Sequence, residues 1–379
     1  MTVINGYRLV TDFKTAGGMA DWALAEKGGE RYFIKRFSKY KYPLDSSPGS
    51  EANKAKKRAV CKRFEARHVA VDSALTKAAV TGSNVVIPLE FFRHETFYYK
   101  VSPHIDIARH EDISTLGRPA QFLLLKTIAR AMEQVHGANV VHGDLKPQKK
   151  DKDGNIIVEI AKAGPVGKLI DFDDSFLAHD LPTRTELMGD APYYSPEMLR
   201  YLEGDPHARI DVQSDIFALG VIFTEYLTGS LPDHGRWHTC AQAVAAGESI
   251  DPGLRKWTQM RALILAMTAP EPSSRPTAGE LLVHLKTMEA DPGYSVSPRS
   301  VRAAPTAGAS AAATGGSKLR GSLLRTTLKP TTPTGGTSAA PRPTATGETA
   351  TPTSTPAAAE RPPSRLVVSK NFGRAPKKR

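Results

Sequence analysis

Two short runs of the chain place carboxylates beside basic side chains. The first, His142-Gly143-Asp144-Leu145-Lys146-Pro147, follows the apolar pair Val140-Val141. The second is Lys168-Leu169-Ile170-Asp171-Phe172-Asp173. Phosphoryl transfer needs a base near the accepting hydroxyl group, a carboxylate oxygen for the metal that neutralises the phosphates, and cations that position them. Together with a lysine nearer the N-terminus, the two runs offer a candidate for each task.

The first run resembles the catalytic loop of protein kinases, whose usual form is His-Arg-Asp-Leu-Lys-Pro. The resemblance implies that Asp144 accepts the proton of the substrate hydroxyl group and that Lys146 steadies the γ-phosphate. A lysine two places after the aspartate is typical of the serine/threonine kinases. The alternative interpretation of this run is a chance polar turn between a helix and a strand.

The second run resembles the strand and the Asp-Phe-Gly turn of the same family, which implies that Asp171 is a magnesium ligand. Asp173 replaces the glycine of that turn. Aspartate tolerates unusual backbone angles better than most residues, so we expect the turn to survive. For Asp173 and its neighbour Asp174, we favour a solvated acidic turn over a role beside the metal.

An ATP-binding region is expected near the N-terminus. The segment 15–22 resembles the glycine-rich loop that covers the phosphates of ATP, with Gly17 at the middle glycine position and Gly18 beside it. One hairpin later, Lys35 ends the run Tyr32-Phe33-Ile34-Lys35 and resembles the lysine that pairs with the α- and β-phosphates. A lone surface lysine on an edge strand is the alternative for Lys35.

In this family the ATP lysine has an acidic partner on the helix that follows it. Residues 51–80 are rich in Ala, Lys, Arg and Glu, which predicts such a helix. Glu51 and Glu65 are the two glutamates between residues 36 and 89. We expect Glu65 to be the partner of Lys35; the alternative is an ordinary glutamate on the helix surface.

The catalytic loop departs from the family pattern at one metal ligand. The family has an asparagine five residues after the catalytic aspartate, and here that position is Lys149, which cannot bind a cation. If six residues are inserted after Gln148, Asn155 takes the place of the asparagine and the apolar run 156–158 follows it. We favour Asn155 as the displaced ligand; the alternative is that this ligand is lost.

Three further residues match positions that support the family fold. The run 189–197, Gly-Asp-Ala-Pro-Tyr-Tyr-Ser-Pro-Glu, resembles the end of a kinase activation segment. The resemblance implies that Glu197 pairs with Arg275. It also implies that Asp215, at the start of an apolar helix, braces the catalytic loop.

Gly143 stands where the family has an arginine that usually binds a phosphate on the activation segment. Without that arginine, phosphorylation of the segment has no obvious receptor. Asp190 also replaces the threonine of the family and adds a fixed negative charge. We therefore expect that Thr183 and Thr185 are not obligatory switches.

Residue patterns divide the chain into three parts. Residues 1–102 contain aromatic and β-branched runs separated by turn residues, which predicts strands. Residues 103–289 have helical periodicity. From residue 290, Thr, Pro, Ala, Gly and Ser dominate, which predicts a disordered tail. The clearest expected elements are strands at 7–10, 22–25, 32–37, 85–93 and 96–101 and helices at 51–80, 121–136 and 215–228.

The expected fold class is therefore α+β, in the bilobal form of a protein kinase. The β-rich N-lobe, which would bind ATP, is residues 1–102. The mainly helical C-lobe, which would carry the catalytic loop, the activation segment and the substrate site, is residues 103–289. Residues 290–379 form the basic tail rich in Thr, Pro and Ala.

The charge of +12 is concentrated in the tail of this chain of 379 residues, because residues 290–379 hold 14 Lys/Arg and three acids. We therefore do not expect the catalytic domain to bind nucleic acid. Cys61 and Cys240 are far apart and match no metal-ligand spacing, which indicates a reducing compartment. The N-terminal segment lacks the pattern of a signal peptide, and no apolar run is long enough to span a bilayer. A cytoplasmic location is expected.

From about residue 7 to residue 287, the chain resembles the bacterial eukaryote-like serine/threonine kinases. The resemblance implies transfer of the γ-phosphoryl group of ATP to Ser/Thr hydroxyl groups of proteins, the protein itself included, with Mg²⁺ or Mn²⁺ as the metal. The basic tail could then dock a partner.

Two other functions remain open. A pseudokinase would hold ATP as a scaffold or regulatory module without transferring phosphate, and the lost loop glycines, Asp173 and Lys149 favour it. Four retained residues oppose it: Lys35, Asp144, Lys146 and Asp171. A small-molecule or lipid kinase on the same fold is disfavoured by Lys146 and by the run at 193–197.

Overall fold

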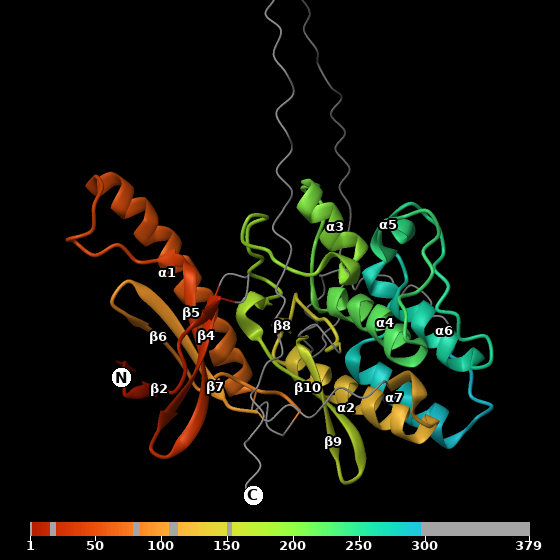
Figure 1. The fold of residues 1–379 in the computed structure, drawn as a ribbon. Coiled ribbons are helices and arrows are strands. Elements are labelled where there is room, and N and C mark those ends of the chain that lie inside the picture. Colours follow the sequence, from red (N-terminus) through yellow and green to blue (C-terminus); the bar gives the residue numbers. More distant parts are fainter. Residues whose placement is uncertain (1, 16–19, 79–83, 106–112, 150–153, 297–379) are drawn as a thin grey trace, which may run out of the picture. The chain divides into compact units, whose positions relative to one another are not determined.

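The computed structural model describes residues 2–15, 20–78, 84–105, 113–149 and 154–296. Gly17 and Gly18 lie outside the described residues, as does the expected tail from residue 297 onward. Within residues 2–296 the strands of the N-terminal part come first along the chain and most of the helices follow (Figure 1). This order agrees with the α+β class expected from the sequence.

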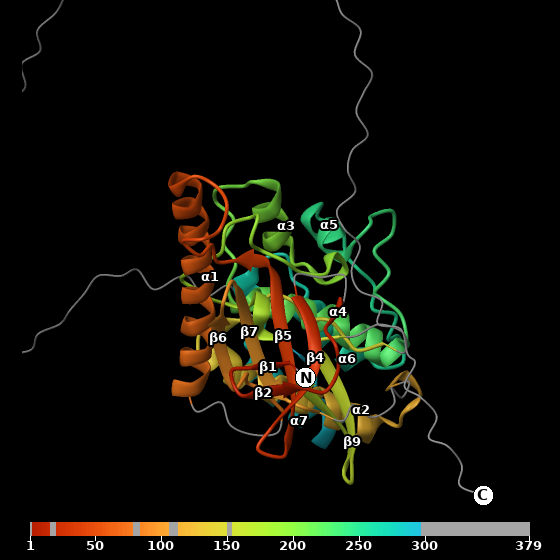
Figure 2. The ribbon, with the colours of Figure 1, turned by 60° about the vertical axis from the view of Figure 1, so that its left-hand side comes forward.

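An antiparallel sheet forms the N-terminal part (Figure 2). The order of its strands is β1-β2-β4-β5-β7-β6, and β3 pairs with β4. The strands are β1 (Val3–Ile4), β2 (Tyr7–Leu9), β3 (Lys14–Thr15), β4 (Ala20–Lys27), β5 (Glu30–Lys41), β6 (Glu90–His94) and β7 (Phe97–Pro103). Side chains alternate between the faces of a strand, so Ala23, Ile34 and Val101 are buried together on one face.

One expected strand begins later than its pattern indicated. The expected strand 85–93 is β6 only from Glu90. Before it, Val85 makes an isolated parallel bridge to Leu169. Pro88 has no N–H group to donate to a strand ladder, which separates the bridge from the strand. The stretch thus joins the sheet to the strand that leads to Asp171.

Helix α1 (Glu51–Lys77) packs against one face of this sheet (Figures 1 and 2). Ser50 begins it, because its side chain accepts a hydrogen bond from the backbone N–H of Asn53. Phe64 of the helix packs against Phe37 of β5 and Tyr98 of β7 in a buried aromatic cluster. The helix expected at 51–80 is therefore confirmed from Glu51 to Lys77, and residues 79 and 80 lie outside the described residues.

The C-terminal part is mainly helical. Its helices are α2 (Arg118–Gly137), α3 (Pro196–Glu203), α4 (Val212–Thr228), α5 (Cys240–Ala245), α6 (Thr258–Met267) and α7 (Ala278–Ala290). Short 3-10 turns are η1 (Ile113–Thr115), η2 (Phe172–Asp174), η3 (Ala191–Tyr193) and η4 (Pro272–Ser274). Helix α4 is buried on nearly all sides, as its apolar sequence predicted. Gly229, with φ +77°, ends it.

Two small antiparallel pairs carry the loops of the site. They are β8 (Val140–Val141) with β11 (Phe176–Leu177), and β9 (Ile156–Ala161) with β10 (Gly164–Leu169). Strand β10 crosses α2 closely at Gly167, where a Cβ atom would lie 2.3 Å from the side chain of Ile128. A glycine is needed there for the strand to approach the helix, and this packing fixes the strand that ends before Asp171.

Candidate active site

The residues of the catalytic loop follow β8, and contacts with Asp215 and with Ile170 hold them in place. The carboxylate of Asp215, at the start of α4, accepts the backbone N–H groups of His142 (2.8 Å) and Gly143 (3.0 Å). The His142 ring nitrogen Nε2 donates to the backbone oxygen of Ile170 (3.1 Å). The expected bracing by Asp215 is confirmed. Since Ile170 precedes Asp171, this contact also ties the first carboxylate run to the second.

Gly143 has a physical reason to replace the arginine of the family. Its φ is +75°, in the left-handed region. A Cβ atom there would lie 3.2 Å from the ring of Phe176 and 3.3 Å from the backbone oxygen of Asp174. The local backbone therefore suits a glycine better than a larger residue.

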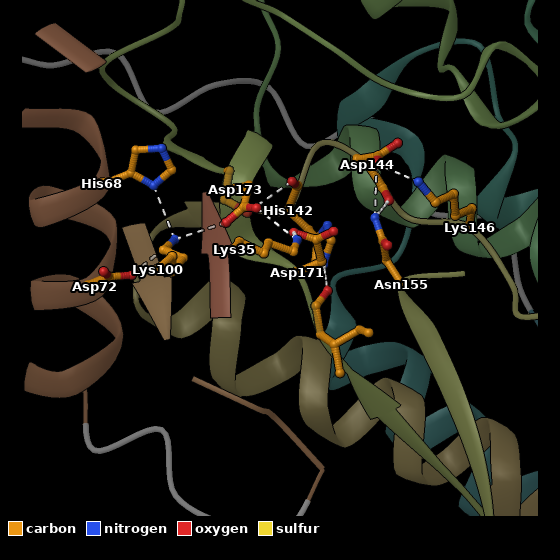
Figure 3. Close-up of polar contacts among 12 residues, drawn as sticks. Lys35, His68, Asp72, Lys100, His142, Asp144, Lys146, Asn155, Asp171 and Asp173 are labelled. Atoms are coloured by element: carbon orange, nitrogen blue, oxygen red, sulfur yellow. Dashed lines mark hydrogen bonds and ion pairs between the residues drawn. The ribbon is translucent and has the colours of Figure 1, made fainter. Parts of the chain in front are cut away.

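Asp144 is buried, with 4% of its surface exposed, and two side chains meet its carboxylate (Figure 3). Lys146 donates to Oδ2 from 2.9 Å. Asn155 donates to the same oxygen from 2.9 Å and to the backbone oxygen of Asp144 from 2.7 Å. The ammonium group of Lys146 and the amide nitrogen of Asn155 thus hold the carboxylate oxygen Oδ2 of Asp144 in place.

Asn155 reaches Asp144 because the backbone at Gly154 lies against the end of the catalytic loop. A Cβ atom at Gly154 would lie 2.3 Å from the backbone nitrogen of Gln148 and 2.4 Å from the backbone oxygen of Pro147. A glycine at this point allows the two backbones to approach so closely. Lys149, at the family position of the asparagine, forms an ion pair with Glu225 (2.5 Å). The structure therefore places Asn155, and not Lys149, beside Asp144.

Asp171 lies two residues after the end of β10 and adopts a left-handed backbone (φ 66°). Its carboxylate meets the ammonium group of Lys35 at 2.6 Å. Asp173 also meets that ammonium group, at 2.8 Å, and its side chain is 12% exposed. The interpretation of Asp173 as part of a solvated acidic turn is therefore wrong. The turn bends its carboxylate inward, where ion pairing offsets the cost of burial.

The expected pair between Lys35 and Glu65 does not form between these two described residues. Glu65 instead accepts a hydrogen bond from the hydroxyl group of Tyr98 (3.3 Å). Burial opposes the charge on Lys35, but Asp171 and then Asp173 outweigh it and raise the pKa of Lys35 above its usual value. Lys35 thus has two acidic partners, and both come from the turn after β10.

Three functional candidates escaped the sequence analysis: Lys100 of β7 and, one helical turn apart on α1, His68 and Asp72. Lys100 is 3% exposed. Its ammonium group lies 3.3 Å from Asp173 and 3.7 Å from Asp72, and it donates to Nδ1 of His68 at 3.1 Å (Figure 3). The sequence offered two signals for these residues. One was a lysine inside the aromatic run 97–101, and the other was a histidine and an aspartate on the apolar side of a helix.

The contact with Lys100 determines the protonation of His68. An ammonium group only donates, so Nδ1 of His68 accepts and its proton is on Nε2. Burial first, and then the charge of Lys100, lower the pKa of His68 well below its usual value. Burial also raises the pKa of Asp72, against the opposing charge of Lys100. His68 is therefore a neutral acceptor in this cluster.

The pair expected between Glu197 and Arg275 is confirmed. Two guanidinium nitrogens of Arg275 donate to the two carboxylate oxygens of Glu197, at 2.6 and 2.8 Å. Neither side chain is more than 1% exposed. Backbone oxygens of Ala269 and Gln213 accept further N–H groups of Arg275. This pair connects the end of the activation segment to the C-terminal helices.

The activation segment is also joined to α1 through Glu186. Its carboxylate accepts the backbone N–H (3.2 Å) and the hydroxyl group (2.8 Å) of Thr183. Arg63 of α1 lies 4.0 Å away. Burial raises the pKa of Glu186, but the hydrogen bonds from Thr183 and the charges of Arg67 and Arg63 outweigh it and lower the pKa overall. A carboxylate therefore already stands among the arginines near Thr183.

The donor set fits a hard cation bound together with phosphates. Asp171 offers carboxylate oxygens, and the amide nitrogen of Asn155 is engaged by Asp144, which leaves its oxygen for a metal. The backbone of Asn155 accepts the N–H of Ile170 (3.0 Å), so the two donors lie on neighbouring segments. No group of three His, Cys, Asp or Glu side chains in the described ranges could hold a metal. Such a partial shell is typical of Mg²⁺ sites that substrate phosphates complete.

Comparison with known proteins agrees with this geometry. Residues 25–285 match the protein kinase domain family. A probable serine/threonine-protein kinase of Clostridium perfringens is 25% identical over 253 residues, which are 64% of this chain and 34% of that protein. A calcium and calcium/calmodulin-dependent serine/threonine-protein kinase of Lotus japonicus is 30% identical over 165 residues, or 42% of this chain and 30% of that protein.

A serine/threonine-protein kinase of Myxococcus xanthus is 26% identical over 216 residues, which are 53% of this chain and 23% of that protein. The chain thus spans about a third or less of the length of these relatives. The family match nevertheless covers most of the chain and includes both carboxylate runs and Lys35. The chain therefore belongs to the protein kinase family.

Proposed function

We propose that this protein is an active kinase that transfers the γ-phosphoryl group of ATP to Ser/Thr hydroxyl groups of proteins, itself included. The observation that carries the proposal is the contact between Asn155 and Asp144. A protein that only binds ATP has no chemical need for a buried amide beside a buried carboxylate. The close approach of Gly154 to the backbone of Pro147 and Gln148 makes this contact possible.

Each described residue then has a task in the reaction. The substrate hydroxyl group loses its proton to Asp144, its oxygen bonds to the γ-phosphorus, and the bond from that phosphorus to the oxygen of ADP breaks. Lys146, 2.9 Å from Asp144, supplies positive charge beside the transferred group. Asp171 and Asn155 would hold Mg²⁺ or Mn²⁺, which neutralises the phosphate charge when it is bound.

The contact between Lys35 and Asp171 implies an exchange of partners when ATP binds. In the structure the ammonium group of Lys35 is 2.6 Å from Asp171, the residue proposed to bind the metal. Phosphate oxygens would replace Asp171 as partners of Lys35, and Asp171 would turn to the metal. Asp173 remains beside Lys35 after this exchange.

The choice of Ser/Thr over Tyr rests on Lys146 and on relatives that are named serine/threonine-protein kinases. A cytoplasmic location also remains a proposal, which the two free, buried thiols of Cys61 and Cys240 support. Across the described ranges, no helix combines the length and the apolar character that crossing a membrane requires. Docking of a partner by the basic tail stays a prediction.

One observation favours a pseudokinase as the second candidate. Two aspartates already neutralise Lys35, so a phosphate must compete with them for this cation. If the two aspartates keep Lys35 when ATP is present, the protein would bind ATP weakly or in an unproductive position. In that case, the contacts of Lys146 and Asn155 with Asp144 would have no role in catalysis.

Labelled ATP distinguishes the two candidates. The purified protein is incubated with Mg²⁺ or Mn²⁺, beside Asp144→Asn and Lys35→Met, and with generic acceptor proteins. Label on Ser or Thr in the wild type alone supports the kinase. Label on Tyr would contradict the specificity proposed here. Stabilisation against heat by ATP without any label would replace the proposal by the pseudokinase.

A further inference from the structure

Two lysines from neighbouring strands share a single carboxylate. Lys35 of β5 and Lys100 of β7 are directly opposite each other in the antiparallel ladder. Lys35 meets Oδ2 of Asp173 at 2.8 Å, and Lys100 meets Oδ1 of the same residue at 3.3 Å. Figure 3 shows Asp173 between the two ammonium groups. The carboxylate at the position of the family's glycine therefore links two strands of the sheet.

Helix α1 contributes to this cluster without touching Lys35. Its His68 and Asp72 are both within 3.7 Å of the ammonium group of Lys100. Among the described residues, the acids within ion-pair distance of Lys35 are Asp171 and Asp173. Helix α1 thus acts on the second lysine, and its effect on Lys35 passes through Asp173.

We propose that Asp173 is the residue that positions Lys35 for the phosphates of ATP, and that Lys100 holds Asp173 in place for this purpose. The inference rests on the proposed function, because it assigns the partner of the ATP lysine. Asp171 is not suited to the task, since it must turn to the metal. Asp173 can stay, because its second oxygen is anchored by a lysine that is 3% exposed.

The charges in the cluster support this division of tasks. Lys100 alone beside Lys35 would repel it, and a buried ammonium group without partners is costly. Asp173 stands between the two cations, while Asp72 and the neutral ring of His68 satisfy the far side of Lys100. Asp173 thus contacts both ammonium groups at once, and this geometry keeps Lys35 oriented.

The competing acid, Glu65, provides the matched comparison. Asp173→Asn and Glu65→Gln each remove one negative charge and keep the shape of the side chain. We expect Asp173→Asn to raise the Kd for ATP with Mg²⁺ about tenfold, and Glu65→Gln to change it less than about twofold. The Kd is measured by titration calorimetry. An unchanged Kd in Asp173→Asn, or a larger effect of Glu65→Gln, overturns the inference.

A mutant cycle separates positioning from support of the fold. The Kd for ATP is measured for Asp173→Asn both in the wild type and in the Lys35→Met variant. If Asp173 acts through Lys35, adding Asp173→Asn to Lys35→Met should raise the Kd less than about twofold. An equal loss in both backgrounds would mean that Asp173 acts elsewhere, and would overturn the inference. Lys100→Met should raise the Kd about threefold alone and add nothing to Asp173→Asn. If Asp173→Asn fails to fold, Asp173→Gly, with the residue of the family, replaces it.

The binding measurements remain informative if the protein transfers no phosphate. A wild type that binds ATP but labels nothing contradicts the proposed function, while the mutant cycle still decides the task of Asp173. A wild type with no measurable affinity for ATP overturns the inference as well, because Lys35 would then have no phosphate to meet. Full activity with a raised KM for ATP in Asp173→Asn agrees with both proposals.

Discussion

The amide of Asn155 donates to the carboxylate of Asp144 at 2.9 Å and to its backbone oxygen at 2.7 Å, across eleven positions of the chain. Both residues are buried, at 4% exposure each. The contact fixes the plane of the amide, and so it also fixes where the amide oxygen points. This contact is the geometry expected if Asn155 is the displaced asparagine of the catalytic loop.

Asn155→Ala tests whether this oxygen is needed. We expect the variant to lose about a hundredfold in kcat/KM, because a metal ligand and the support of Asp144 disappear together. Lys149→Ala is the control, since Lys149 pairs with Glu225 and should change activity by less than about threefold. Steady-state kinetics at several Mg²⁺ concentrations measure both. Equal activities of the two variants would show that Asn155 has no such task.

Gly154→Ala tests the close backbone approach that places Asn155 beside Asp144. The added Cβ atom would lie 2.3–2.4 Å from backbone atoms of Pro147 and Gln148, which cannot move without the loop. We expect a loss of about 1–3 kcal/mol in the free energy of unfolding, with reduced activity. Gly137→Ala is the control, because a Cβ atom added there would meet nothing within 4 Å, and it should leave the free energy of unfolding unchanged. Chemical denaturation measures both, and a neutral Gly154→Ala would contradict the geometry.

Glu197→Gln tests the buried ion pair with Arg275. The variant leaves a guanidinium group with 0% exposure without its counter-charge, so we expect a cost of about 3–5 kcal/mol. Arg236→Ala breaks an exposed pair with Glu248 of similar length (2.9 Å) and should cost less than about 1 kcal/mol. Denaturation curves of both variants give the comparison. Similar costs would mean that burial does not decide the strength of the pair.

Acidification should destabilise the protein through His68. Its pKa in the folded protein is below the value of about 6.5 in the unfolded chain, so the unfolded state takes up the proton first. Stability from this residue is full above pH 6.5 and falls below it, by at most about 1.4 kcal/mol per pH unit. The groups that act on its charge are Lys100, Arg67, Lys35 and Asp171.

His68→Gln removes the titrating ring, so the slope of unfolding free energy against pH between about 5 and 6.5 should become shallower. His207→Gln, at an exposed position, is the control and should keep the slope of the wild type. Denaturation with urea at closely spaced pH values measures the difference. Parallel slopes for His68→Gln and the wild type would contradict the assignment.

The double variant Thr183→Ala/Thr185→Ala tests whether phosphorylation of the activation segment is required. Glu186 already supplies a carboxylate near Arg63, so we expect the variant to keep kcat within about threefold of the wild type. Kinetics together with the thermal midpoint measure the effect. A loss of activity beyond tenfold with an unchanged midpoint would show that the threonines are obligatory after all.

The local chemistry of the site could be predicted from the sequence. Asp144 and Lys146 are two residues apart on one tight loop, so their meeting required no knowledge of the fold. The apolar sequence of α4 predicted its burial, because a helix without a polar side has no face for water. Asn155 was also expected beside the catalytic loop from the apolar run that follows it, although its contact with Asp144 depends on the close approach of Gly154 to that loop.

The sequence by itself determined the family and the order of the elements. Only the tertiary structure decided which carboxylate meets Lys35. Glu65 had the expected type and helix, but the rotation of α1 about its axis turns it to Tyr98. Asp173 had the pattern of a surface turn, but Lys100 from the next strand lies where it folds inward. Ion pairs between distant segments depend on how strands and helices cross, and local spacing does not encode that geometry.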